Sequence, residues 1–351
     1  MTAAPRARTS AQTTSHDPHQ GIELRGGNLR AQITPFGGYL TRLELADGRD
    51  VVLAHESAAA RSFDDQHLGC VVGRCANRIR GGMFELDGWH LQLPCNSHDS
   101  HLHGGLTGFG SQVWEVVERD AATLLLRLRS PDGHENYPGN LVAEARFSIS
   151  GSASSSASGD ATLRLELDAV TDKATLCNLT WHPYFQLDGH GAGPIDEHRI
   201  MIEADSWLPM GNDHCPTGEV ADVADTPFDL RTAHAMRRGL ESKHAQIRLA
   251  EGFDHCFLIR GEGLRRAARV NSPDGQVAME VWSTQPGLQF YTGNGLSLQR
   301  GGKDGASYRR REGFCLEAQG LPDAPNHRHF PSTILRPGER YRQIIEYRFE
   351  L

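Results

Sequence analysis

The sequence predicts an all-β protein, built as one large antiparallel β-sandwich. Apolar residues alternate with polar ones at a period of two in several segments. The 38 glycines and 17 prolines divide the chain into short pieces, which disfavours long helices. Strands that are buried on one face only suit antiparallel sheets packed face to face. Two stacked β domains are the alternative arrangement.

The expected elements follow in chain order. The polar segment 1–21 lacks the apolar core of a secretory signal and is interpreted as a disordered leader. A single sandwich domain is expected over 22–351, with clear strands at 141–149, 162–169 and 340–351. The Ser/Ala/Gly-rich stretch 150–159 lies between two of these strands and is expected to be a hairpin loop. The one expected helix is 232–246.

The net charge and the cysteine pattern limit the partners and the cellular compartment that are expected. Lys and Arg total 36 and Asp and Glu total 44, so the net charge of −8 makes nucleic acid an unexpected partner. No apolar run approaches the ~18 residues of a membrane span. The seven cysteines are scattered without a CxxC pair, which favours a reducing cytoplasm and disfavours a structural zinc site.

Three histidines stand close together at 98, 101 and 103. In an extended strand His101 and His103 point to the same side, as two ligands of a transition metal would. No further ligand follows at a suitable spacing, so hydrogen bonding or solvation is the favoured interpretation. Gly104 and Gly105 fit a turn that lets backbone approach a ligand closely.

Two later segments carry candidate acid–base groups. His182 stands between Trp181 and Tyr184, where an aromatic wall and a proton donor could bind a sugar; the alternative is a buried core histidine. Glu317 lies in an apolar strand, where desolvation would raise its pKa and suit it to base chemistry. The alternative is that Glu317 occupies the solvated face of an alternating strand.

Four polar residues, considered singly, are more often structural than functional. They lie beside apolar or glycine-rich sequence and are Asn77, Arg78, Asp254 and Gln289.

A series of motifs along the chain favours a functional interpretation of these residues over a structural one. In order, the motifs are GRCANRI at 73–79, LHGG at 102–105, SPDG at 130–133, YPGN at 137–140, NLTWHPYF at 178–185, TPFD at 226–229, FDH at 253–255, PGLQFYTGN at 286–294, GFCLE at 313–317 and FPST at 330–333. Together they resemble the aldose 1-epimerase (galactose mutarotase) family. The likeness runs from about Ile22 to the C-terminus, apart from the Ser-rich loop.

The resemblance implies a large β-sandwich with a cleft across one sheet and a cofactor-free, metal-free exchange of α and β anomers of a monosaccharide. It implies Glu317 as general base, His182 as general acid and His103 as the second active-site imidazole. Arg78, Asp254 and Gln289 match positions that hold sugar hydroxyls, with Asn77 beside them. A cytoplasmic monomer or homodimer is expected.

Such chemistry opens and recloses a hemiacetal, and a carboxylate and an imidazolium on opposite sides of the sugar could move both protons. Trp181, Pro183 and His101 depart from the family pattern, which bears on substrate preference. Trp181, Tyr184, Phe290 and Tyr291 are expected near the cleft.

Three alternatives remain. One is a non-catalytic carbohydrate-binding module on the same sandwich. Another is a metal enzyme built on the three clustered histidines. A glycoside hydrolase is the third, although hydrolysis wants two carboxylates flanking one bond.

Overall fold

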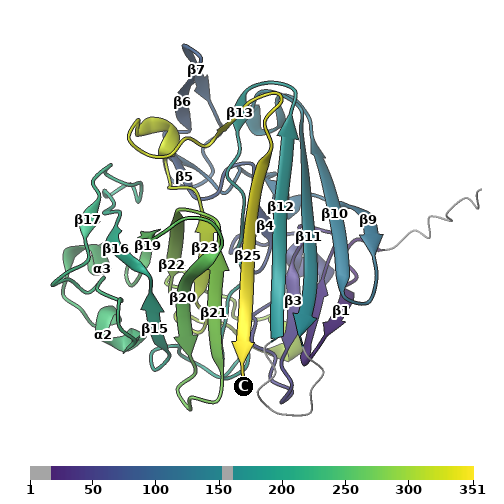
Figure 1. Ribbon diagram of the computed structural model, residues 1–351, viewed down its shortest axis with the longest axis vertical. Coiled ribbons are helices and arrows are strands. Elements are labelled where there is room, and N and C mark those ends of the chain that lie inside the picture. Colours follow the sequence, from purple (N-terminus) through teal and green to yellow (C-terminus); the bar gives the residue numbers. More distant parts are fainter. Residues whose placement is uncertain (1–16, 152–160) are drawn as a thin grey trace, which may run out of the picture.

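The computed structural model describes residues 17–151 and 161–351, and the strands of its sheets pair antiparallel (Figure 1). The largest sheet has nine strands in the spatial order β18 (His234–Ala235), β15 (Arg199–Ile202), β20 (Arg265–Asn271), β21 (Ala278–Ser283), β25 (Tyr341–Glu350), β12 (Ala161–Thr171), β11 (Leu141–Gly151), β10 (Thr123–Ser130) and β9 (Glu115–Arg119). The prediction of an all-β fold is confirmed.

The remaining strands form smaller sheets. A five-stranded sheet has the order β17 (Ala221–Asp222), β16 (Ala204–Trp207), β19 (Asp254–Ile259), β22 (Gly287–Tyr291) and β23 (Cys315–Gln319). A three-stranded sheet joins β1 (Ile22–Gly26), β2 (Leu29–Ile33) and β3 (Leu40–Glu44). The paired strands are β13 (Thr175–Leu176) with β24 (Ile334–Leu335), β14 (Thr180–Trp181) with β4 (Val71–Val72), β5 (Arg78–Arg80) with β8 (Ser100–Leu102), and β6 (Met83–Leu86) with β7 (Trp89–Gln92).

The core follows from the alternation along the long strands. Leu163, Leu165 and Leu167 of β12 are buried, whereas the residues between them are partly exposed. Phe147 of β11 pairs with Leu165 in the register, so apolar side chains line up across the strands. One continuous apolar cluster contains these residues together with Leu316 of the five-stranded sheet. The two larger sheets therefore share a core, and β25 lies near the middle of the nine-stranded sheet (Figure 1).

The hairpin and the leader are covered only in part. Gly151 pairs with Ala161, so β11 and β12 form the two arms of the expected hairpin. Most of the expected loop, residues 152–160, lies outside the described residues, as does most of the leader, residues 1–16. Within the described part, the Phe36 amide donates to the Pro18 carbonyl at 2.8 Å, and the His19 ring stacks on Phe36.

The expected helix 232–246 is wrong in extent. The structure has β18, then α2 (Met236–Leu240), a turn, and α3 (Ala245–Leu249). Glycine at 239 is a poor helix former. A Cβ there would lie 2.3 Å from the Phe253 ring, so packing excludes residues with a higher helix propensity at this position. His244 begins α3 anew by accepting a hydrogen bond from the Gln246 amide.

The other helical segments are short. They are α1 (Ala58–Arg61) and the 3₁₀ turns η1 (Phe109–Ser111), η2 (His134–Asn136), η3 (Lys303–Gly305) and η4 (Ala324–Asn326). Among the described residues, none of the helices has the length and apolar character needed to cross a bilayer.

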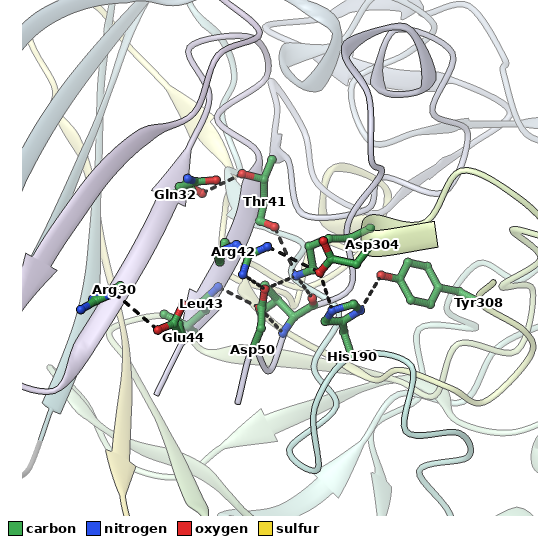
Figure 2. A network of polar contacts seen from close by, with 12 residues as sticks. Arg30, Gln32, Thr41, Arg42, Leu43, Glu44, Asp50, His190, Asp304 and Tyr308 are labelled. Atoms are coloured by element: carbon green, nitrogen blue, oxygen red, sulfur yellow. Dashed lines mark hydrogen bonds and ion pairs between the residues drawn. The ribbon is translucent and has the colours of Figure 1, made fainter. Parts of the chain in front are cut away.

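A buried ion pair anchors the connection between β22 and β23. Lys303 Nζ lies 2.6 Å from Asp50 Oδ2 and donates to the Val52 carbonyl at 2.7 Å. Arg42 contacts both Asp50 and Asp304, and His190 contacts Asp304 (Figure 2). Burial lowers the pKa of Lys303 to about 8, although Asp50 opposes the shift. The loop that carries Lys303 is thereby tied to the β3 side of the molecule.

Candidate active site

Neighbouring strands of the five-stranded sheet present the candidate polar residues. Gln289 on β22 lies directly opposite Glu317 on β23. Alternate residues face opposite sides of a strand, so both side chains point away from the core that contains Phe290 and Leu316. Gln289 Nε2 also donates to Oδ1 of Asp254, the first residue of β19, at 2.7 Å. The strand register thus aligns an amide with two carboxyl groups on one face.

The imidazole of His182 faces this row from the end of β14. His182 directly follows β14, and its Nε2 lies 3.4 Å from Glu317 Oε1. Both residues are buried, with 4% of His182 and 2% of Glu317 exposed. Glu317 Oε2 has no hydrogen-bond partner among the described residues. The structure therefore brings the two expected acid–base groups into contact and leaves one carboxyl oxygen available.

Burial shifts the pKa values of this pair in opposite directions. It lowers the pKa of His182 to about 3. It raises the pKa of Glu317 well above the ordinary value, and the negative charge of Asp254 adds to that rise. A pair shifted in this way holds one proton over a broad pH range. These shifts favour Glu317 as the holder of that proton, and the short gap between Nε2 and Oε1 permits its transfer to His182.

His103 has a fixed hydrogen-bonding role. It follows β8, and its ring centroid lies 5.3 Å from that of His182. The backbone amide of Asn77 donates to His103 Nδ1 at 3.2 Å. An amide N–H can only donate, so Nδ1 must be the acceptor and Nε2 must carry the proton of the neutral ring. Burial lowers the pKa of His103 well below the ordinary value, which keeps the ring neutral. His103 is therefore a hydrogen-bond donor through Nε2.

The remaining expected residues lie around the same site. Arg78, at the start of β5, donates from Nη1 to Ser97 Oγ at 2.9 Å, and its amide donates to Asn77 Oδ1 at 2.8 Å. Burial raises the pKa of Asp254, whereas the charge of Arg78 opposes that rise. Gln289 Oε1, like one oxygen of Glu317, has no partner among the described residues. These groups offer both donors and acceptors to a polyhydroxylated ligand.

One residue beside the site was not expected. The His67 ring lies 4.7 Å from that of His103 and 6.0 Å from that of His182. Together with His103, it lines a cavity of about 220 Å³ whose wall also includes Phe63 and Leu106, both largely exposed. No motif of the sequence pointed to His67, which enters the site only because the loop before β4 folds back over it.

Comparisons with known proteins agree with this site. A family model described as aldose 1-epimerase matches residues 20–348. Galactose mutarotase from Bos taurus is 39% identical over 335 residues, which cover 94% of each chain. Aldose 1-epimerase from Escherichia coli is 33% identical over 354 residues, covering 97% of this chain and 98% of the relative. The chain belongs to the aldose 1-epimerase family. It is an isomerase that interconverts the anomers of aldoses.

Solved structures of the aldose 1-epimerase fold agree as well. The aldose epimerase homologue from C. elegans aligns with a TM-score of 0.85 at 28% identity, covering 94% of this chain and 98% of that one. Galactose 1-epimerase from Lactobacillus acidophilus aligns with a TM-score of 0.81 at 29% identity and covers 94% of each chain. The galactose mutarotase-like fold expected from the sequence is confirmed.

Two of the four aromatic residues expected near the cleft of this epimerase lie elsewhere. Trp181 is fully buried, donates from Nε1 to the Gly69 carbonyl at 2.9 Å, and belongs to the main core. Phe290 belongs to the same core. Tyr184 and Tyr291, in contrast, lie beside the His182 imidazole, with centroids 5.1 and 6.5 Å from it. Trp181 therefore serves packing and does not line the face that presents Gln289 and Glu317.

The metal site considered for the three clustered histidines is wrong. His101 contacts the Pro94 carbonyl through Nδ1 and the Tyr137 hydroxyl through Nε2, both at 2.7 Å, so neither nitrogen is free. His98 is exposed and lies near His214 instead. His101 is thus a structural residue of the epimerase.

A different group has the composition of a metal site. Ligand atoms of His103, His182 and Glu317 lie within 4.8 Å of one another. However, the amide of Asn77 occupies His103 Nδ1, and the proton on Nε2 blocks ligation there. This tautomer suits a hydrogen-bond donor to a ligand and does not suit a metal ligand.

The expected placement of acid and base on opposite sides of the sugar is also wrong. Glu317 and His182 touch each other, so no ring lies between them.

Proposed function

We propose that Glu317 and His182 are the acid–base pair of this aldose 1-epimerase. The observation that carries the proposal is the 3.4 Å contact between His182 Nε2 and Glu317 Oε1 in a buried site that leaves Glu317 Oε2 without a partner. With the shared proton on His182, the carboxylate of Glu317 can accept the proton of the anomeric hydroxyl. His182 Nε2 can then donate its proton to the ring oxygen.

The bonds balance without a cofactor. As the anomeric O–H bond breaks, its electrons form the carbonyl at C1, the bond from C1 to the ring oxygen breaks, and the ring oxygen gains a proton. Rotation about C1–C2 presents the other face of the aldehyde. The same transfers in reverse close the ring as the other anomer, and both protein groups regain their starting states. Each positioned proton transfer contributes roughly 10²–10⁴-fold.

The surrounding residues are proposed to hold the sugar. His103 Nε2–H is directed into the site as a donor, which suits it to an oxygen on which negative charge develops as the ring opens. Arg78, Asp254 and Gln289 would fix hydroxyls at the other end of the ring, with Asn77 supporting Arg78 and His103. Fixing the ring in this way leaves C1 as the part that turns.

Galactose is the proposed first substrate, because several relatives are galactose mutarotases. A cytoplasmic monomer or homodimer remains part of the proposal. All seven cysteines are free thiols, which fits a reducing compartment.

Polarimetry on freshly dissolved α-galactose tests the assignment, followed by glucose, xylose, arabinose and fucose. We expect the unaltered protein to accelerate mutarotation and the His182→Asn variant to lose at least about 100-fold in rate. His90→Asn is the matched control, because His90 lies exposed on β7. Retention of activity by His182→Asn would reject the proposed acid. Saturable sugar binding without acceleration by the unaltered protein would favour a carbohydrate-binding module.

A further inference from the structure

The two active-site imidazoles differ in what contacts their Nδ1 atoms. His103 Nδ1 faces a backbone amide, which can only donate. His182 Nδ1 lies 3.5 Å from the Sγ of Cys315. A thiol can both donate and accept a hydrogen bond. The ring of His103 is thus restricted to one tautomer, whereas that of His182 is not.

The strand geometry explains how Cys315 reaches this position. Cys315 and Glu317 lie two residues apart on β23, so their side chains point to the same face at a separation of about 7 Å. Glu317 contacts Nε2 of His182 and Cys315 contacts Nδ1 of the same ring. One strand therefore holds the imidazole at both of its nitrogens.

The environment of Cys315 keeps its sulfur as a thiol. Cys315 is fully buried in a small apolar cluster with Leu53, Tyr184 and Leu296. Burial raises its pKa well above the ordinary value, and the charge of Glu317 adds to the rise. The S–H group therefore persists at neutral pH, and the imidazole nitrogen is the one polar partner found for it among the described residues.

We propose that Cys315 is a positioning residue whose thiol stays bonded to His182 Nδ1 while Nε2 gains and loses its proton. When His182 is an imidazolium, Nδ1–H donates to sulfur. When the neutral ring carries its proton on Nε2, the S–H donates to Nδ1. When Glu317 holds the shared proton and donates a hydrogen bond to Nε2, the neutral ring carries its own proton on Nδ1, and Nδ1–H donates to sulfur. The ring thus keeps its orientation through each proton transfer.

Two substitutions and a control test this inference, which rests on the proposed roles of His182 and Glu317. Cys315→Ala removes the partner, and Cys315→Ser keeps a group that donates and accepts. Cys177→Ala removes another buried thiol, for which no imidazole contact is found among the described residues. A hydrogen bond of ordinary net strength corresponds to about two- to tenfold in rate. We expect Cys315→Ala to lose about tenfold in kcat with KM within about twofold, Cys315→Ser to recover most of that loss, and Cys177→Ala to match the unaltered enzyme.

Nitrogen-15 NMR of the ring nitrogens supplies a readout that a packing role would not move. We expect the shifts of His182 to move in Cys315→Ala and to stay unchanged in Cys177→Ala, and those of His103 to report a protonated Nε2 in every variant. Equal kcat in Cys315→Ala and Cys177→Ala, or no rescue by serine, would overturn the proposal. If Cys315→Ala fails to fold, the Cys315→Ser variant and the spectrum of the unaltered protein decide.

The two levels of failure are distinguishable. Absence of mutarotation by the unaltered protein would contradict the proposed function, whatever the thiol does. Active enzyme whose His182 shifts ignore the loss of Cys315 would contradict the positioning role alone.

Discussion

Replacement of Glu317 by glutamine should separate catalysis from stability. An amide of nearly the same shape cannot accept the anomeric proton, so the general-base contribution of roughly 10²–10⁴-fold is lost, or about 3–5 kcal/mol of transition-state stabilisation. Folding should not suffer. Burial and the charge of Asp254 raise the pKa of Glu317, which means that the folded protein disfavours the carboxylate.

The stability effect has a defined pH dependence. Between the ordinary and the raised pKa, the folded state holds a proton on Glu317 that the unfolded state has released. The unaltered protein therefore loses about 1.4 kcal/mol of unfolding free energy per pH unit across that interval, and Glu317→Gln does not. We expect the stability of Glu317→Gln relative to the unaltered protein to rise from pH 4.5 toward neutrality.

Two assays check this prediction on the same preparations. Polarimetry measures the mutarotation rate, and urea unfolding at pH 5 and pH 7.5 measures the two free energies of unfolding. A variant that keeps more than a tenth of the activity would refute Glu317 as base. A variant whose relative stability falls between pH 5 and pH 7.5 would refute the argument from burial.

Two further predictions concern other titrating groups. Because burial lowers the pKa of His182 to about 3, its ring should stay neutral between pH 5 and pH 8 in the free enzyme, and a titration of its ring nitrogens near pH 6.5 by NMR would contradict the environment described for this ring. Lys303 has its pKa lowered to about 8 from 10.5, so above pH 8 its folded form binds fewer protons than its unfolded form and stability rises with pH. Urea unfolding should show the unaltered protein gaining about 3 kcal/mol relative to Lys303→Met between pH 8 and 10.5; a flat difference would contradict the desolvation of the Lys303 ammonium by burial.

Alternation predicted the long strands because each has one face in the core and one in solvent. It succeeded for β11, β12 and β25, where side-chain period and burial coincide. Sequence pattern did not give the extent of the helix expected over 232–246. The helix ends early because Gly239 is required against the Phe253 ring, which is a contact between distant segments. No local pattern contains that contact.

The same alternation could have corrected one functional assignment. Once Gln289 is placed in the site, its neighbour Phe290 must face the opposite side of the strand, which is the core. Likewise, Glu317 sits on a face that looks solvated in the pattern but is covered by the segments carrying His182 and His103. The period of a strand identifies a face, and the loops above it decide whether that face meets water.

His67 and Cys315 show where sequence reasoning stops. His67 reaches the site through a loop with a left-handed backbone at that residue, and no periodicity describes such a loop. Cys315 stands in a recognised motif, but its role depends on which ring nitrogen it contacts. Contacts of this kind depend on three-dimensional position.

Two unpartnered oxygens of the active site link the proposed sugar binding to activation. Glu317 Oε2 and Gln289 Oε1 are acceptors without donors among the described residues, and sugar hydroxyls are donors. A hydroxyl that donates to Glu317 stabilises its ionised form, and so shifts the shared proton toward His182. That is the form in which the proposed base can accept the anomeric proton and the proposed acid can donate to the ring oxygen. Because burial disfavours the charged forms of both His182 and Glu317, the proposed reactive arrangement depends on hydrogen bonds from a bound sugar.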